Sequence, residues 1–208
     1  MTTADSHNGR RLTARGAKTR ARIVAAAADL MYVKGVGNTT LDDVLAASGV
    51  SKSQLYHHFE GKDALVRAVV DHVGAHVIAR ERRALGRVST IRGLRRWRDA
   101  LVQNSALQHA AYGCALGSLA AEVSDQDALA RQTLFQLFTE WRDLLAGVLQ
   151  RMQVRGVLPP EAPIDQLGTG LMAALQGGYM LAQTARDVTP MATSIDMALA
   201  HIESLSSG

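Results

Sequence analysis

A short run of polar side chains between residues 51 and 59 has the composition of a surface that bonds to a partner outside the chain. Its apolar members, Leu55 and Phe59, are four residues apart, so they share one face of a helix and leave the polar residues on the other. Gln54 carries an amide of the kind that pairs with adenine through two hydrogen bonds. The other members of the polar face are Lys52, Ser53, Tyr56 and His57.

The segment before this run predicts the helix that holds it in place. Thr39 is a suitable N-cap, and Asp42, three residues later, has the spacing of a capping box. Gly49 suits the left-handed end of this helix, and Ser51 suits the start of the next. The apolar face of the first helix consists of Leu41, Val44 and Leu45. The pattern predicts a helix-turn-helix, a motif that places its second helix in the major groove of DNA.

These residues resemble the signature of TetR-type transcriptional regulators. The resemblance rests on residues 39–44, 49–51, 55–59 and 62–65, and it extends over about residues 17–75. It implies that Thr40 and Lys62 contact DNA phosphates, while the polar face of the second helix contacts bases and backbone. The predicted DNA-binding residues are Thr40, Ser51, Lys52, Ser53, Gln54, Tyr56, His57 and Lys62.

Two later segments, 113–122 and 175–187, resemble the LmrA/YxaF-like branch of the same family. The resemblance implies a homodimer through helices at about 164–186 and 191–205, and a repressor that a small apolar or aromatic effector releases from a palindromic DNA operator. Two recognition helices would then lie about 34 Å apart, in successive major grooves. Such a regulator would act in the cytoplasm, on the nucleoid. The alternative is a helical carrier or sensor of apolar molecules without specific DNA binding.

The composition predicts an all-α globular protein. Hydrophobic residues make up 47% of the chain and charged residues 20%, with only four prolines. We expect about nine helices, with an N-terminal three-helix DNA-binding unit joined to a C-terminal helical ligand-binding and dimerisation domain. Residues 1–62 contain nine Lys/Arg and five Asp/Glu, so the net charge of +4 lies entirely in this part. Attraction to phosphate requires that placement, although a solvated basic tail gives the same count.

The chain divides into three predicted segments. Residues 1–16 are a disordered basic arm, residues 17–62 the helix-turn-helix domain, and residues 63–208 a linking fourth helix plus the ligand-binding and dimerisation domain. The arm either reaches phosphate or the minor groove, or is a flexible tail. Ser124 and Asp127 have the spacing of a capping box for the longest helix. The expected helices are 18–34, 39–48, 52–59, 62 to the mid-80s, 91–108, 115–123, 126–155, 164–186 and 191–205.

Aromatic residues are only 4% of the chain, yet several cluster in the C-terminal part. We expect an effector pocket between helices five, seven and eight, with apolar walls and a few polar groups. The alternative is that these side chains are ordinary core. The predicted ligand-binding residues are Trp97, Tyr112, Phe135, Phe138, Trp141, Met172, Leu175, Gln176 and Tyr179.

The remaining features favour neither catalysis nor a cofactor. His72 and His76 have a spacing that can hold a metal, but the motif contains no third ligand, so we expect ordinary histidines and no metal. The sequence contains no nucleophile–base motif, no paired catalytic carboxylates and no phosphate loop, and we expect no enzyme activity. Cys114, the only cysteine, is expected to pack as a small hydrophobic residue and not to sense redox changes. No apolar run approaches the roughly 20 residues that span a bilayer, so we expect no membrane partner.

Overall fold

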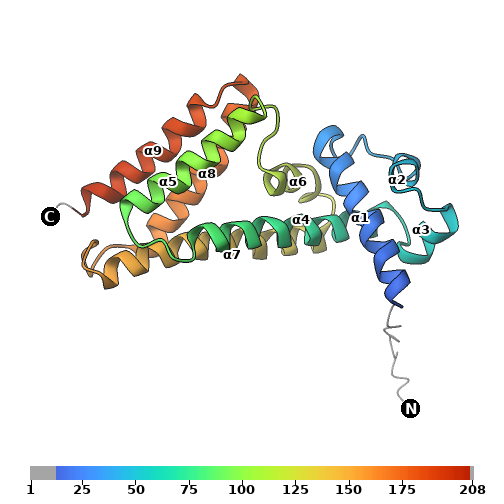
Figure 1. Cartoon of the computed structure of the whole chain (residues 1–208), viewed down its shortest axis with the longest axis horizontal. Coiled ribbons are helices and arrows are strands. Elements are labelled where there is room, and N and C mark those ends of the chain that lie inside the picture. The colour runs from blue at the N-terminus through green and yellow to red at the C-terminus, as the bar shows by residue number, and fades with distance from the viewer. Residues whose placement is uncertain (1–12, 207–208) are drawn as a thin grey trace, which may run out of the picture.

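The computed structural model describes residues 13–206, and this part of the chain forms nine α-helices and no strand. Figure 1 shows α1–α3 at one end of the molecule and α5, α8 and α9 at the other, with α4 and α7 running between them. The predicted all-α, two-part architecture is thereby confirmed. The helices are α1 (Ala14–Lys34), α2 (Leu41–Ser48), α3 (Lys52–His58), α4 (Lys62–Leu85), α5 (Ile91–Leu107), α6 (Ala115–Val123), α7 (Ala128–Val154), α8 (Ile164–Ala185) and α9 (Thr189–Ser204).

Apolar side chains of α1, α2 and α3 make the core of the N-terminal unit. Ile23 and Ala27 of α1 and Leu55 of α3 are completely buried, and Phe59, which ends α3, is nearly so. The guanidinium of Arg20 lies 5.2 Å from the centroid of the Phe59 ring, a cation–π contact between α1 and the end of α3. These contacts bury the inner face of α3 and leave its outer face to solvent.

The first helix starts four residues earlier than the predicted start at Lys18. Thr13 is the N-cap, because its hydroxyl oxygen accepts a hydrogen bond from the amide of Gly16 at 3.1 Å. Residues 14–16, expected to belong to the disordered arm, are therefore helical. The rest of the predicted basic arm, residues 1–12, lies outside the described residues.

The longest helix begins at Ala128 and not at residue 126, because Asp127 is its N-cap and Ser124 is not. The Asp127 carboxylate accepts hydrogen bonds from the amides of Leu129 and Ala130 at 2.9 and 3.0 Å. The predicted Ser124–Asp127 capping box is therefore wrong in the roles of its residues. Every other predicted helix end agrees with the structure to within two residues.

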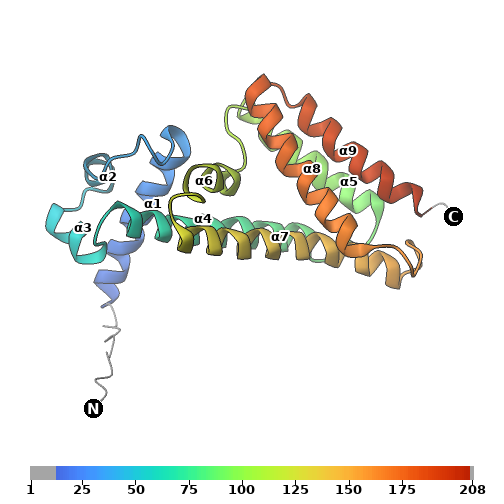
Figure 2. The same cartoon turned by 180° about the vertical axis from the view of Figure 1, so that it is seen from behind.

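The fourth helix connects the two parts of the molecule. Leu65 and Val69 near its start are completely buried next to the N-terminal unit, and Leu85 at its end is completely buried in the C-terminal part. Figures 1 and 2, which view the molecule from opposite sides, both show α4 and α7 side by side. A change in the tilt of α4 would therefore move the N-terminal unit relative to the C-terminal domain.

The last two long helices form a closely packed pair. A Cβ atom at Gly178 of α8 would lie 3.0 Å from the Cα atom of Met191 in α9. Glycine costs about 1 kcal/mol in a helix interior relative to alanine. Close approach of the two helices offsets this cost and explains glycine at this position.

Candidate nucleic-acid interface and effector cavities

The third helix presents its polar face to solvent at the end of the molecule opposite α9 (Figure 1). Lys52, Ser53, Gln54, Tyr56 and His57 are all exposed. The buried residue Leu55 anchors the helix from behind, so the exposed side chains have a fixed backbone. A short, braced helix with an exposed row of donors and acceptors has the form needed to enter the major groove.

The turn and the start of this helix are formed as predicted. Gly49 ends α2 in the left-handed conformation, with φ of 63°. Ser51 caps α3: its hydroxyl oxygen accepts from the amide of Gln54 at 3.2 Å, and the side-chain oxygen of Gln54 accepts from the amide of Ser51 at 2.9 Å. Pairing with adenine uses the same side-chain oxygen as an acceptor. Gln54 must therefore share or release the Ser51 amide when it contacts a base.

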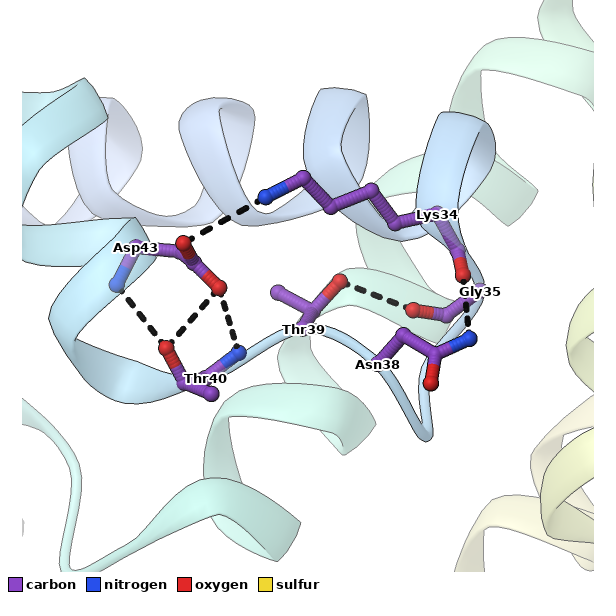
Figure 3. A network of polar contacts seen from close by, with 6 residues as sticks. All are labelled: Lys34, Gly35, Asn38, Thr39, Thr40 and Asp43. Atoms are coloured by element: carbon purple, nitrogen blue, oxygen red, sulfur yellow. Dashed lines mark hydrogen bonds and ion pairs between the residues drawn. The ribbon is translucent and has the colours of Figure 1, made fainter.

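The start of α2 corrects the predicted cap by one residue. Thr40 is the N-cap: its hydroxyl accepts from the Asp43 amide at 3.1 Å and donates to the Asp43 carboxylate at 2.8 Å, and its amide donates to the same carboxylate at 3.0 Å (Figure 3). Thr39 instead donates to the carbonyl oxygen of Gly35 at 2.8 Å. Because both donors of Thr40 are bound to Asp43, a phosphate contact by Thr40 requires this box to open.

Hydrogen bonds from two sides hold the loop between α1 and α2. Lys62, at the start of α4, donates through Nζ to the carbonyl oxygen of Gly37 at 3.2 Å. The amide of Gly37 donates to the carboxylate of Glu122 in α6 at 3.0 Å. Arg67 of α4 pairs with the Asp127 carboxylate at 2.7 Å, close to the same junction. The C-terminal domain is thus bound directly to the N-terminal unit, through partners too far apart in sequence to leave a local pattern.

Three cavities in the described part of the chain bear on effector binding. The first, of about 300 Å³, lies between α1, α4, α5 and the segment before α6. The second is a groove of about 380 Å³ between α7 and α8, and the third, of about 470 Å³, lies between α6 and α8. The first has walls from both parts of the molecule, because Tyr32 of α1 faces Tyr112 with ring centroids 4.9 Å apart.

The predicted pocket residues are distributed over these cavities and the core. Tyr112 and Tyr179 line the first cavity. The groove between α7 and α8 is lined by Phe135, Phe138, Met172 and Gln176. Gln176 and Tyr179 also line the third cavity. Trp97, Trp141 and Leu175 are buried in the core. The structure thus brings four of the nine together in one groove and does not gather all nine around a single pocket.

A buried carboxylate explains the position of Trp97. The indole N–H of Trp97 donates to one oxygen of Glu81 at 2.9 Å, and Arg80 donates to the other oxygen at 2.9 Å. Glu81 is only 1% exposed, so its charge depends on these two donors. Trp97 therefore has a structural role in this state, as a partner of Glu81.

Sequence reasoning missed most of the residues that line the first cavity, among them Asp29, Tyr32 and Ser105. Ser105 is 5% exposed, and its hydroxyl has no hydrogen-bond partner within residues 13–206. The only local signal was a polar residue four positions after the core residue Leu101. Burial raises the pKa of the phenols of Tyr32 and Tyr179, so both are uncharged at neutral pH.

His72, His76 and Cys114 belong to no three-residue cluster of metal-ligating side chains among the described residues. The rings of His72 and His76 are 4.4 Å apart, but the described residues contain no group of three metal-ligating side chains. Nδ1 of His76 lies 2.8 Å from the carbonyl oxygen of His72, which can only accept, so this nitrogen carries the proton. Cys114 is buried, and burial raises the pKa of its thiol, which disfavours the reactive thiolate. No helix between residues 13 and 206 is long and apolar enough to cross a membrane.

Comparisons with known proteins agree with this arrangement. The family model described as "Bacterial regulatory proteins, tetR family" matches residues 23–69, and the model described as "Tetracyclin repressor-like, C-terminal domain" matches residues 90–198. An uncharacterised HTH-type transcriptional regulator of Mycobacterium tuberculosis is 30% identical over 179 residues, which cover 83% of this chain and 88% of the relative. YxaF of Bacillus subtilis, an uncharacterised HTH-type transcriptional regulator, is 26% identical over 182 residues, which cover 86% and 92%.

Solved structures show the same fold. The crystal structure of a TetR transcriptional regulator from Chloroflexus aurantiacus superposes with a TM-score of 0.76 at 28% identity, covering 91% of this chain and 96% of that one. The similarity to YxaF also supports the resemblance to the LmrA/YxaF-like branch. The chain therefore belongs to the TetR family of bacterial transcriptional regulators, which are DNA-binding proteins and not enzymes.

Proposed function

We propose that the protein is a homodimeric repressor that leaves a palindromic operator when a small aromatic or apolar effector binds its C-terminal domain. The observation that carries the proposal is the exposed polar face of α3, braced by a buried apolar core, on a chain whose C-terminal domain contains cavities. The likeness of residues 90–198 to a tetracyclin repressor C-terminal domain supports repression. The protein would act in the cytoplasm, on the nucleoid.

We assign the proposed roles to different parts of the chain. Residues 17–62 contact DNA, with Gln54 and the polar face of α3 on the bases and Lys62 on a phosphate. Residues 63–208 bind the effector and dimerise. Residues 1–12, which precede the Thr13 cap of α1, add positive charge to the DNA-binding part through Arg10 and Arg11.

Exposed apolar residues on α8 and α9 support the proposed dimer interface. Met180 of α8 is 63% exposed and Met197 of α9 is 71% exposed. A Cβ atom at Gly170 or Gly177 of α8 would meet nothing within 4 Å, so this face has room for a close partner helix. Solvent-facing methionines beside small residues are typical of a surface that packs against another protein.

Effector binding must act through a shift between two conformations of the dimer. A ligand that binds equally well to both conformations, which differ in the spacing of the two α3 helices, does not change their populations. Moving the equilibrium from about 1:99 to 99:1 requires about 5.5 kcal/mol of preference for the spacing that does not fit DNA. The bonds of the α1–α2 loop to α4 and α6 supply a route by which the C-terminal domain can set that spacing.

A gel-shift titration on the DNA that flanks the protein's own gene tests the proposal. Wild type should retain this fragment at nanomolar protein, with affinity falling steeply as salt rises. Lys62→Ala should lower the slope of log affinity against log salt by about one unit, on all sequences alike. Lys62→Arg keeps the charge and should keep the slope. Retention of unrelated DNA with the same affinity as the flanking DNA would refute specific repression.

A further inference from the structure

The first cavity lies where the DNA-contacting unit meets the C-terminal domain. Asp29 and Tyr32 belong to α1, which is the brace of the helix-turn-helix. The opposite walls come from α4, from α5 and from the segment around Tyr112. Figure 1 shows this segment and α6 lying beside α1. An occupant of this cavity would touch both parts of the molecule at once.

The cavity has aromatic walls. Tyr32 and Tyr112 approach with ring centroids 4.9 Å apart and planes tilted by 33°. The rings of His72 and His76 line the α4 side, 4.4 Å from each other. A flat aromatic molecule can stack or meet edges with such rings. The cavity volume of about 300 Å³ is at the lower end of the range for small-molecule sites.

One polar group in the cavity wall has no partner. The Ser105 hydroxyl is buried and makes no hydrogen bond to any described residue, although a buried hydroxyl normally has one. Ser105 lines the cavity, so a ligand group can supply the missing bond. A phenol, amide or carbonyl group of the occupant would satisfy it.

The charges around the cavity disfavour a charged occupant. Among the described residues that line the cavity, Arg80 is the only lysine or arginine, and it is already paired with the buried Glu81 at 2.9 Å. Asp29 at the exposed rim would repel an anion. A cation would in turn lie near Arg80, and the inner end at Ser105 and Tyr179 offers it only uncharged groups.

The backbone at this cavity also stores strain. His109 and Ala110, between α5 and the cavity residue Tyr112, both have left-handed φ angles, of 53° and 48°. Such angles are uncommon for residues other than glycine. Two of them in sequence form an unusual backbone conformation in the connection next to the cavity lining.

We propose that this interdomain cavity binds an uncharged aromatic molecule with one hydrogen-bonding group, which contacts Tyr32 and Tyr112 and bonds to Ser105. Through Tyr32 the occupant bears directly on α1 and so on the position of α3. This step rests on the proposed repressor function, but binding itself can be measured without DNA.

Three probes that share a biphenyl skeleton and differ in charge test the ligand class. They are 4-phenylphenol, biphenyl-4-carboxylate and biphenyl-4-ylmethylammonium. Each is titrated into the full-length protein at pH 7 by ligand-observed NMR. 4-Phenylphenol should saturate one site per protomer with a dissociation constant on the order of 1 mM or tighter, the value for a ligand of about 13 heavy atoms at ordinary efficiency. The two charged probes should bind at least fivefold more weakly. Equal or tighter binding of a charged probe, or no saturable binding of the phenol, would overturn the proposal.

Matched variants locate the site. Ser105→Ala removes an unpartnered hydroxyl, so the fold should tolerate it, while affinity for 4-phenylphenol should fall about fivefold. Asn104→Trp places a large side chain at an exposed position of the cavity lining and should lower affinity more than tenfold. Thr139→Trp places the same large side chain at a half-buried position that lines the groove between α7 and α8, and it should leave affinity unchanged. Loss of binding in Thr139→Trp alone would place the ligand in that groove and overturn the proposal.

A DNA-binding measurement separates the cavity assignment from the repressor proposal. If 4-phenylphenol binds as described while wild type fails to retain the flanking DNA, the repressor proposal fails and the cavity assignment stands. If DNA is retained but the phenol does not bind, the cavity assignment fails and the repressor proposal stands. With both in place, Tyr32→Ala should retain DNA and require more than tenfold more phenol for release. Release at the wild-type concentration would show that Tyr32 takes no part in binding.

Discussion

Gln54 has one observed role and one proposed role. Its amide oxygen completes the capping box with Ser51, and the same amide is the group that we propose to contact adenine. Replacing Gln54 with alanine would therefore remove a capping bond as well as the proposed base contact. A loss of operator affinity in Gln54→Ala alone does not separate these effects.

The first prediction uses glutamate to separate them. Gln54→Glu keeps a side-chain acceptor for the Ser51 amide, since glutamate suits this position of a capping box. Gln54→Ala should cost about 1–3 kcal/mol on the operator through the lost base contact and little on random DNA. Gln54→Glu should retain thermal stability and still lose the operator preference. Equal losses on operator and random DNA in both variants would show that Gln54 only positions the helix.

The second prediction concerns acid sensitivity of the α2 cap. Hydrogen bonds from the backbone and side chain of Thr40, and one from Lys34, hold the pKa of the Asp43 carboxyl below its usual value. A lowered native pKa stabilises the fold above the unfolded-state pKa of about 4, and this contribution is lost as pH falls through the native pKa. The thermal midpoint of Asp43→Asn should therefore lie below that of wild type at pH 7 and approach it below pH 4.

The control for this experiment is Asp42→Asn, which removes a charge from the same turn. Its difference from wild type should change less over that pH range, because Thr40 bonds to Asp43 and not to Asp42. A difference between Asp43→Asn and wild type that is constant from pH 7 to pH 3 would contradict the assignment.

Residue-level roles were predictable where side-chain chemistry was unambiguous. Ser51 and Gly49 were placed correctly, because only one residue at each turn suits the task. Thr39 and Thr40 are identical in type, so composition does not show which of them is the cap. In the structure the Thr39 hydroxyl donates to the carbonyl oxygen of Gly35, so it does not cap α2.

At the scale of elements, strong periodicity was sufficient to find the helices. The apolar face predicted for α2 includes Val44, which is buried in the structure, and the apolar pair predicted for α3, Leu55 and Phe59, is buried as well. The cavity walls were not predictable in the same way. Tyr32 and Tyr112 are brought together by packing between α1 and the segment before α6, and nothing in either local pattern indicates the other.

The third prediction concerns the link between α6 and the DNA-binding unit. Glu122 accepts from the Gly37 amide at 3.0 Å, so Glu122→Ala should expose that amide to exchange. A hydrogen bond of this kind contributes about 1 kcal/mol, so exchange at Gly37 should accelerate several-fold. Residue-resolved hydrogen exchange by NMR measures this change.

Glu122→Gln is the matched control for that link, because its amide oxygen can still accept. It should exchange at close to the wild-type rate. Effector titrations on the two variants then show whether the link transmits: Glu122→Ala should release DNA at a different effector concentration, and Glu122→Gln should not. Identical exchange at Gly37 in all three proteins would mean that the bond is not maintained in solution.

At the scale of the whole molecule, the fourth prediction tests the proposed dimer interface. Met197→Arg introduces a charge at an exposed apolar position of α9. Burying that charge should cost on the order of 3 kcal/mol, which is about 100-fold in the dimer dissociation constant. Light scattering after size exclusion should then report monomers at micromolar concentration, and operator binding should be lost because two half-sites require two linked α3 helices.

Val154→Arg is the matched control, since Val154 is 88% exposed at the end of α7 and lies on neither α8 nor α9. It should remain dimeric and retain the operator. If Met197→Arg still forms a dimer with an unchanged dissociation constant, the interface lies elsewhere. A monomeric wild type would contradict the proposed homodimer. The whole-chain fold was predictable from pattern and resemblance, whereas the proposed surface between two copies is indicated only by exposed apolar residues such as Met180, Leu181 and Met197.

The closed bond between Ser51 and Gln54 has a kinetic consequence for target search. If Gln54 contacts adenine as proposed, phosphate attraction would hold the protein on non-cognate DNA while the capping bond stays closed, so Gln54 would not probe each base pair. At the operator, adenine would compete with the Ser51 amide for the side-chain oxygen of Gln54, and the side chain would change partner. Arrival would then be equally fast on every sequence, and selectivity would appear as dwell time. A protein with a glutamine locked in this way should differ from its variants in how long it stays and hardly at all in how soon it arrives.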